Sequence, residues 1–324
     1  MSRLTRGYVT NELNIMTTAE QESLIIRRGS PWWRMLLRDR FALVAALWLF
    51  VLTLCFLFGP LLFEDAATKL NLRARNLPPG SLEHGWLMYL GGDALGRPML
   101  ARLIVASRNT LAIALSAVFV AMIVGGILGM IAGYVGRSVG HVIMRFADIL
   151  QSFPSLLLAV VVLYILEPNV TNLVIVLAIT RLPIYLRVTR AEVLEIRERV
   201  FVDAARALGG SRYHILRRHI TPVVAPTLLT ILTVDFSIVM LAESSLSFLG
   251  IGIQPPEITW GLMVAAGRNY LSQAWWLAFL PGLAIMMATL SGNILSNWLR
   301  VVSDPEQRWR LEDSSGKTSG QTDA

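Results

Sequence analysis

Two acidic residues stand out because they lie inside an otherwise apolar stretch. Asp235 is at the centre of TLLTILTVDFSIVM, and Glu243 follows near the end of the same run. An ionisable group at membrane depth is costly, so it normally faces a cavity or the inside of a helix bundle. Asp235 therefore either lines a pathway, where it contacts an ammonium or backbone group of a solute, or forms a hydrogen bond between helices, in which its carboxyl can be protonated or charged. Glu243 either caps the neighbouring loop or lines a gate.

The sequence lacks the motifs of catalysis, nucleotide binding and metal binding. The segment SSGKTSG at 314–320 ends like a phosphate-binding loop, but Leu311 stands where that loop needs a glycine. His214 and His219 are five residues apart, which would place them on different sides of an α-helix. Cys55 lies inside an apolar run, and no HExxH motif or pair of intramembrane aspartates occurs. We therefore expect no enzyme, no metal site and no cofactor in this chain.

Apolar residues come in blocks that are long enough to form membrane helices. Hydrophobic residues make up 54% of the 324 and charged residues 16%, with a mean hydropathy of +0.57, whereas a soluble domain carries about 25% charged residues. Four blocks reach the roughly 20 residues that cross a bilayer core. We predict an all-α membrane protein with six transmembrane helices, at 41–63, 109–132, 149–166, 170–186, 223–242 and 275–295.

The third and fourth blocks are shorter than the others. They are separated only by Glu167-Pro168-Asn169, which indicates a tight turn at the membrane surface. A single buried hairpin is the alternative for this pair.

Basic residues indicate how the spans are oriented. With the N-terminus inside, the inside segments hold 21 of the Lys and Arg residues and the outside segments hold 7. Positive charge favours the cytoplasmic side, so both termini are predicted to be cytoplasmic. The net charge of +7 suits loops beside anionic lipid and needs no nucleic acid to explain it.

These spans divide the chain into four predicted segments. The N-terminal segment lacks the pattern of a cleaved secretory signal, so we expect the first span to be an uncleaved anchor; Met1 and Met16 both remain candidates for the start. The segments are a cytoplasmic tail (1–40), the first helix with an outer loop (41–108), a membrane core (109–300) and a second cytoplasmic tail (301–324).

Three glycines in the second span recur at every fourth position. Such a spacing places small residues in a ridge that lets another helix approach closely. The glycines, at Gly125, Gly129 and Gly133, are expected to pack helices together rather than to line a pathway.

The stretch between the fourth and fifth spans, residues 187–222, predicts a helical elbow. An apolar face forms at helical spacing from Phe201, Ala204, Ala205 and Leu208. Two of these four residues are alanines, so the face is flat and allows another surface to approach closely.

Paired glycines follow this helix. Gly209 and Gly210 should end it, because glycine tolerates the left-handed turn of a helix C-terminus. A second short helix comes next, and we expect Pro222 to stop it before the fifth span. The stretch has no room for the third helix and the core of a DNA-binding helix-turn-helix, so no nucleic acid partner is predicted.

The run DAARALG…HITP resembles the EAA loop of permease subunits in binding-protein-dependent ATP-binding-cassette (ABC) importers. That motif has Glu-Ala-Ala, three residues, glycine, and later an Ile-x-Pro-like ending; this chain has Asp203 in place of the glutamate and Thr221 where leucine is common. In that family the elbow is a coupling helix that docks into a groove on a cytoplasmic ATPase. The resemblance assigns this role to Asp203, Ala204, Ala205, Leu208, Gly209 and Pro222.

Two further stretches narrow the resemblance to the C-type permease of dipeptide and oligopeptide importers. They are LGGDALGRPMLARLIVASRNTL at 90–111 and LAESSLSFLGIGIQPPEITWGLMVAAGR at 241–268. The similarity runs in order through about residues 30–305, and Pro98, where the subfamily usually has a polar residue, is a local departure.

The resemblance implies a methionine-importer-like transmembrane fold in a bacterial inner membrane. It also implies a homologous second permease, two cytoplasmic ABC ATPase subunits that bind ATP and Mg²⁺, and a periplasmic or lipid-anchored solute-binding protein. The implied substrate is a di- or oligopeptide; nickel or another small solute is the alternative within the subfamily, because the binding protein does most of the selection. An ATP-independent channel is a more distant alternative, in which the elbow would have no purpose.

Overall fold

The structure is a computed structural model that describes residues 32–82 and 85–303. Within this part of the chain every regular element is a helix, and the one β-pairing is an isolated bridge between Gly92 and Pro98. The predicted all-α fold is confirmed. The chain divides into two units, one of residues 1–40 with 309–324 and one of residues 41–308. The short helix α2 (Trp32–Arg38) belongs to the first unit, and the second contains the features below.

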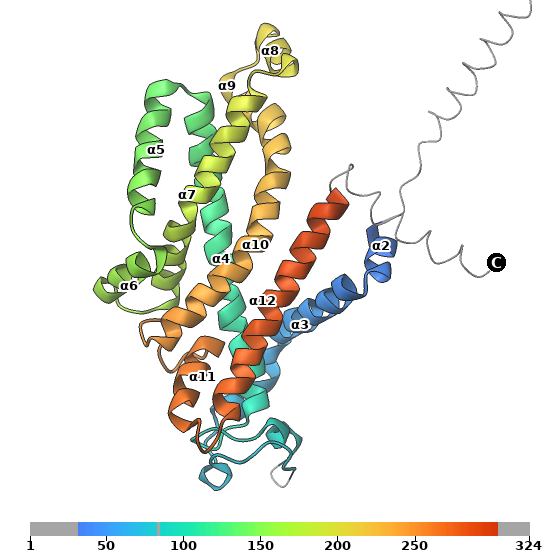
Figure 1. Ribbon diagram of the computed structural model, residues 1–324, viewed down its shortest axis with the longest axis vertical. Coiled ribbons are helices and arrows are strands. Elements are labelled where there is room, and N and C mark those ends of the chain that lie inside the picture. Colours follow the sequence, from blue (N-terminus) through green and yellow to red (C-terminus); the bar gives the residue numbers. More distant parts are fainter. Residues whose placement is uncertain (1–31, 83–84, 304–324) are drawn as a thin grey trace, which may run out of the picture. The chain divides into compact units, whose positions relative to one another are not determined.

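Five helices among the described residues are long and apolar enough to cross a membrane. Most extend beyond the predicted windows, because a helix continues where its apolar run has already ended. At 1.5 Å per residue even a helix of 27 residues is about 40 Å long, more than the roughly 30 Å of a bilayer core. The five are α3 (Arg40–Thr68), α4 (Met99–Tyr134), α7 (Val170–Ile196), α10 (Thr221–Phe248) and α12 (Trp276–Ser303) (Figure 1).

The third predicted span, 149–166, is wrong as a single straight helix. Two helices, α5 (Arg137–Gln151) and α6 (Ser155–Ile165), meet there at 87°. Pro154 causes the break, because the residue before a proline is driven away from the helical conformation. Counting the bent pair as one span gives six. The neighbouring α7 is long enough to cross a membrane by itself, which removes the alternative of a single buried hairpin.

The predicted glycine ridge of α4 lies directly against α7. A methyl group added to Gly129 would lie 2.5 Å from Thr189 Cβ, and one added to Gly133 would lie 2.8 Å from Val193 Cβ. Gly125 makes the same kind of approach to Tyr185, at 2.7 Å. The two backbones are therefore so close that no side chain fits between them at these positions.

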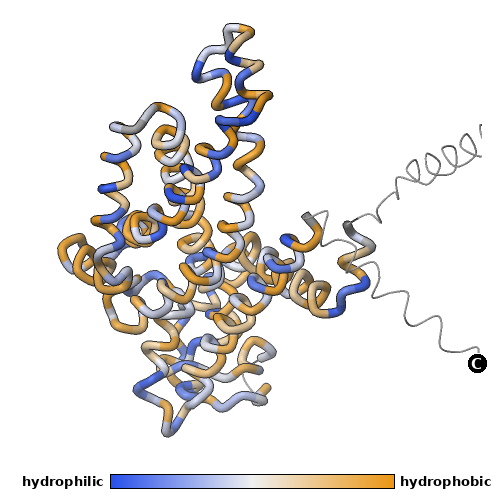
Figure 2. The backbone as a smooth tube through the Cα atoms, turned by 45° about the horizontal axis from the view of Figure 1, so that its top comes forward, coloured by the Kyte–Doolittle hydropathy of each residue, from blue (hydrophilic) through white to orange (hydrophobic). Residues whose placement is uncertain are grey.

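Loops and short helices lie at the two ends of this bundle (Figure 1). One end carries α8 (Val200–Ala207) and α9 (Arg212–Ile215). The opposite end carries the segment between α3 and α4, with its two 3₁₀-helices Leu72–Ala74 and Trp86–Leu90, beside α11 (Trp260–Gly267). Figure 2 shows hydrophobic residues along the long helices and hydrophilic residues gathered at the α8 end.

Pro222 does not stop a helix, contrary to the prediction. A π-helical turn (Leu216–Ile220) joins α9 to α10, so that one continuous helix runs from Arg212 to Phe248. Pro222 follows this turn closely, and the wider π-helical winding before it makes room for the proline ring in the continuous helix. The wider turn also supplies bonds of its own: the Thr221 N–H and hydroxyl both donate to the Leu216 carbonyl, the hydroxyl at 2.8 Å.

The same turn changes the placement of two histidines. His214 and His219 were expected on different sides of a helix, yet their rings meet edge to face with centroids 5.7 Å apart. The π-helical register brings residues five apart close together, which an α-helix does not.

Candidate functional site

The predicted apolar face of the elbow is turned outward on α8. Leu208 is 89% exposed and Phe201 41% exposed, and Ala204 is exposed as well. Ala205 differs, because it is half-buried and packs on the small core that contains the buried Val202. The outward face is thus narrower than predicted and consists of Phe201, Ala204 and Leu208.

The paired glycines close α8 with two hydrogen bonds in the Schellman arrangement. The Gly210 N–H donates to Ala205 O at 3.0 Å, and the Gly209 N–H donates to Arg206 O at 3.0 Å. Gly209 has φ +81°, a conformation that a residue with a side chain adopts only with strain. A Cβ on Gly210 would lie 2.7 Å from Ala205 O. Both positions therefore require glycine, and the elbow is a defined turn rather than a loose loop.

Asp203 lies on the other side of α8, in its first turn. Its carboxylate pairs with Arg206 at 2.9 Å, and both side chains are more than half exposed. An exposed pair of this kind adds little to stability. It leaves the Asp203 carboxylate accessible at the surface of the elbow.

Asp235 faces a guanidinium across the bundle. It is 2% exposed, and Arg181 of α7 donates Nε to Oδ2 at 3.2 Å and Nη2 to Oδ1. A charge buried away from water needs an opposite charge and hydrogen bonds, and the two-pronged contact supplies both. The interhelical contact of Asp235 is therefore an ion pair with Arg181. A role in the pathway stays a prediction.

A cavity of about 240 Å³ opens beside this ion pair, between α6, α7 and α10. Arg181 lines it, together with the hydroxyl-bearing residues Ser155, Thr180 and Ser245. The guanidinium thus has Asp235 on one side and a hollow on the other.

Glu243 has a different environment near the end of α10. It is fully buried and accepts hydrogen bonds from Ser247 Oγ at 2.8 Å and Ser244 Oγ at 3.3 Å. Gly261 of α11 packs so closely that an added Cβ would lie 2.7 Å from Ser244 Cα. Glu243 therefore sits where α10 and α11 meet, with hydroxyls as its neighbours.

Arg181 was not predicted from the sequence as the partner of Asp235. An arginine inside an apolar block is as unfavourable as an aspartate, so the position of Arg181 already indicated that it needs a partner. The sequence does not show that the two side chains meet in space, since Arg181 and Asp235 are 54 positions apart. Among the described residues no group of three or more His, Cys, Asp or Glu side chains is arranged to hold a metal ion.

These helices define a multi-pass membrane protein with an ion pair between two of its helices and a glycine-capped elbow at one end. Residues 125–309 match the family described as binding-protein-dependent transport system inner membrane component. Residues 30–79 match the N-terminal transmembrane domain of oligopeptide transport permease C. The chain belongs to this family of inner membrane components: it is a permease subunit of an ABC importer, a transport subunit rather than an enzyme.

Curated relatives cover most of the chain. The di/tripeptide transport system permease protein DppC of Pseudomonas aeruginosa is 37% identical over 91% of this chain and 98% of its own length. The probable D,D-dipeptide transport system permease protein DdpC of Escherichia coli is 33% identical, over 79% and 84%. The glutathione transport system permease protein GsiD of Pectobacterium atrosepticum is 33% identical, over 86% and 92%.

A solved structure is also similar in part. It is an inward-facing conformation of the MetNI methionine ABC transporter, 18% identical, with a TM-score of 0.49 over 62% of this chain and 98% of that chain.

Proposed function

We propose that this chain forms half of the translocation pathway for di- or oligopeptides and that α8 couples the pathway to a separate ATPase. One observation carries the coupling: Leu208, a large apolar side chain, is 89% exposed on a short helix outside the spanning segments. An apolar residue displayed in this way, beside Phe201, is typical of a surface that a partner covers. The rigid glycine cap keeps the surface in one orientation.

The proposed assembly contains four further subunits. They are a homologous second permease, two cytoplasmic ABC ATPases and a periplasmic or lipid-anchored solute-binding protein. ATP and Mg²⁺ bind to the ATPases, and this chain binds neither. Both termini lie in the cytoplasm, in agreement with the bias of the basic residues. The relatives named for di/tripeptides, D,D-dipeptides and glutathione are the reason for proposing peptides as substrates.

The continuous helix from Arg212 to Phe248 offers a route from the elbow to the membrane core. In the proposed mechanism, ATP closes the ATPase dimer, the elbow moves with it, and α10 carries this motion to Asp235. The pathway then alternates between its inward-open and outward-open forms.

A charge placed on the exposed face tests the coupling. Leu208→Glu should leave the fold intact, because the side chain is exposed, but it should prevent docking on an apolar surface. The measurements are co-purification of the ATPase subunits and ATP-driven peptide uptake in vesicles. Leu208→Met, which keeps an apolar side chain of similar size, is the matched control and should behave as the wild type. Normal ATPase recovery and uptake with Leu208→Glu would show that the elbow is only an interfacial loop.

Uptake measurements with two solutes test the substrate. Vesicles that contain the complete complex and its binding protein should accumulate a labelled dipeptide only with ATP. Accumulation of Ni²⁺ in place of the dipeptide would select the nickel alternative. Flux of either solute without ATP would indicate a channel.

A further inference from the structure

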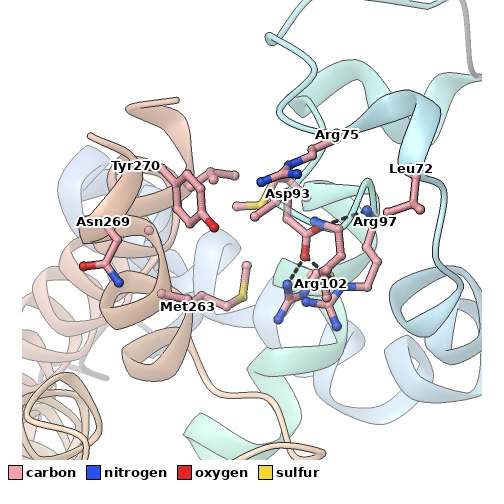
Figure 3. A pocket seen from close by; sticks show the side chains of 14 residues that line it. Leu72, Arg75, Asp93, Arg97, Arg102, Met263, Asn269 and Tyr270 are labelled. Carbon is pink, nitrogen blue, oxygen red and sulfur yellow. Dashed lines mark hydrogen bonds and ion pairs between the residues drawn. The ribbon is translucent and has the colours of Figure 1, made fainter. Parts of the chain in front are cut away.

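A second cavity, of about 420 Å³, lies at the end of the bundle opposite the elbow. It forms between the segment that joins α3 to α4, the start of α4, and α11 with the residues that follow it. Its lining includes four apolar side chains, those of Leu72, Met99, Met263 and Leu277. It also includes three arginines. Figure 3 shows the side chains around this space.

Asp93 is the one acidic side chain among the residues that line this cavity, and it is already saturated. Its Oδ1 accepts the N–H groups of Leu95 at 2.9 Å and Arg97 at 2.8 Å. Its Oδ2 accepts Arg97 Nε at 2.7 Å and Arg102 Nη1. A carboxylate offers about four lone-pair positions, so Asp93 has no acceptor left for a further donor.

Donors around the cavity outnumber these acceptors. Arg75 lines the space without an ion pair to any described residue, and Figure 3 shows it and the Tyr270 hydroxyl directed to the same space. Arg102 is 8% exposed, yet its buried Nε has no hydrogen-bond partner. Three guanidinium groups and one carboxylate thus line the cavity, and its side chains carry an excess positive charge that an added anion would balance.

We propose that this cavity binds the carboxylate of a small organic ligand. Arg75 and Arg102 would hold the carboxylate, since a guanidinium and a carboxylate form strong charge-assisted hydrogen bonds. The apolar side chains of the lining would contact the organic body of the ligand. An inorganic anion has no such apolar part, so the lining favours an organic carboxylate. The proposal rests on the function proposed above only in taking a short peptide as one carrier of the carboxylate; an acidic side chain of a docking protein is the other.

Direct binding to the full-length chain in lipid nanodiscs tests this proposal. The probes are the dipeptide Ala-Ala, its C-terminal amide, and N-acetylglutamic acid 1-amide, whose only carboxylate is on the side chain. Saturation-transfer NMR and calorimetry should show binding of Ala-Ala. The affinity for the amide should be at least about tenfold lower, which is the loss expected for a hydrogen bond to a charged group. Equal binding of acid and amide would overturn the proposal.

Two variants place the binding at the cavity. Arg75→Gln should weaken Ala-Ala roughly tenfold, since it removes the unpaired guanidinium without touching Asp93. Arg73→Gln is the matched control: it removes a basic residue of the 3₁₀-helix that ends just before Arg75, and this residue does not line the cavity. It should leave the affinity within about twofold. If Arg75→Gln binds as the wild type does, the assignment is wrong.

The remaining outcomes identify the ligand. Tight binding of N-acetylglutamic acid 1-amide supports the carboxylate site and assigns it to the acidic side chain of a partner. Binding of Ala-Ala alone supports it and assigns it to a peptide terminus. Displacement of either by inorganic phosphate at the same concentration would show a general anion site and overturn the organic ligand. The assay needs no ATPase, so a failure of the coupling proposal would leave its result unchanged.

Discussion

Asp235 and Glu243 lie on the same helix, α10, and both are buried, but they have different kinds of hydrogen-bond partner. Asp235, 2% exposed, has the opposite charge of Arg181 beside it, and this arginine also lines a cavity. Glu243, 0% exposed, has hydroxyl groups, and it lies where α11 packs closely. An ion pair beside a hollow can exchange partners with a solute, whereas a carboxyl within a packed interface holds two helices together. We therefore predict a role in the pathway for Asp235 and a structural role for Glu243.

The largest effect should come from removing Asp235. Asp235→Ala leaves the half-buried Arg181 guanidinium without its partner, which should destabilise the protein by about 3 kcal/mol, the low end for the loss of one partner of a buried ion pair. The midpoint of thermal unfolding in detergent measures it. The double variant Asp235→Asn/Arg181→Gln removes both charges and should recover most of this stability. If the double variant is as unstable as Asp235→Ala, the loss of stability does not come from an unpaired Arg181 charge.

Glu243→Leu should have a smaller effect on the same unfolding midpoint. The substitution leaves the Ser247 and Ser244 hydroxyls without their acceptor, at a cost of about 1–3 kcal/mol. Glu243→Gln keeps an acceptor oxygen of the same reach and serves as the control, with a cost well below that of Glu243→Leu. A Gln variant as damaging as Asp235→Ala would mean that Glu243 acts as a charge, and the contrast between the two sites would fail.

Arg181→Lys should separate stability from transport. Lysine keeps the positive charge but loses the planar fork, so we expect a loss of only about 1 kcal/mol in stability. If the pair lines the pathway, ATP-driven uptake should fall while ATPase subunits still co-purify. Unchanged uptake together with unchanged assembly would place Arg181 and Asp235 outside the pathway.

The smallest effect concerns Asp93, a carboxylate paired with arginines but outside the spanning helices. Burial acts to raise its pKa, but the charge of Arg102 and the hydrogen bonds and charge of Arg97 outweigh this, so that its pKa is lowered. A lowered pKa in the folded state stabilises the protein above the unfolded value of about 3.9, and this contribution is lost as the pH falls through the folded value. Thermal unfolding below about pH 4 should therefore differ between wild type and Asp93→Asn less than it does at pH 7. An equal difference at both pH values would contradict the assignment.

Local pattern was enough to predict the long helices and the glycine features. Apolar blocks predicted the membrane helices, the spacing of Gly125, Gly129 and Gly133 identified the face of α4 that meets α7, and paired glycines predicted the end of α8. Each of these depends on residues within a few turns of one another.

Features that depend on distant residues or on small backbone energies were not predicted. The partner of Asp235 is 54 positions away, and only tertiary packing brings Arg181 to it. Pro154 breaks a helix, whereas Pro222 lies within the first turn of one. The difference lies in the backbone before each proline: a π-helical turn leads into Pro222, whereas the chain has left α5 after Gln151, before it reaches Pro154. Sequence alone does not say which register the chain takes before each proline.

The close approach of α4 and α7 has a mechanical consequence. With Thr189 and Val193 set against Gly129 and Gly133, neither helix can slide along the other without a collision of atoms. The two helices therefore form one rigid unit, about 40 Å or more in length. One end of this unit leads into α8 at Val200, and the other reaches Met99 beside the arginine-lined cavity. If the elbow moves as proposed, a tilt of this helix pair would also displace its far end, in addition to the motion carried by α10.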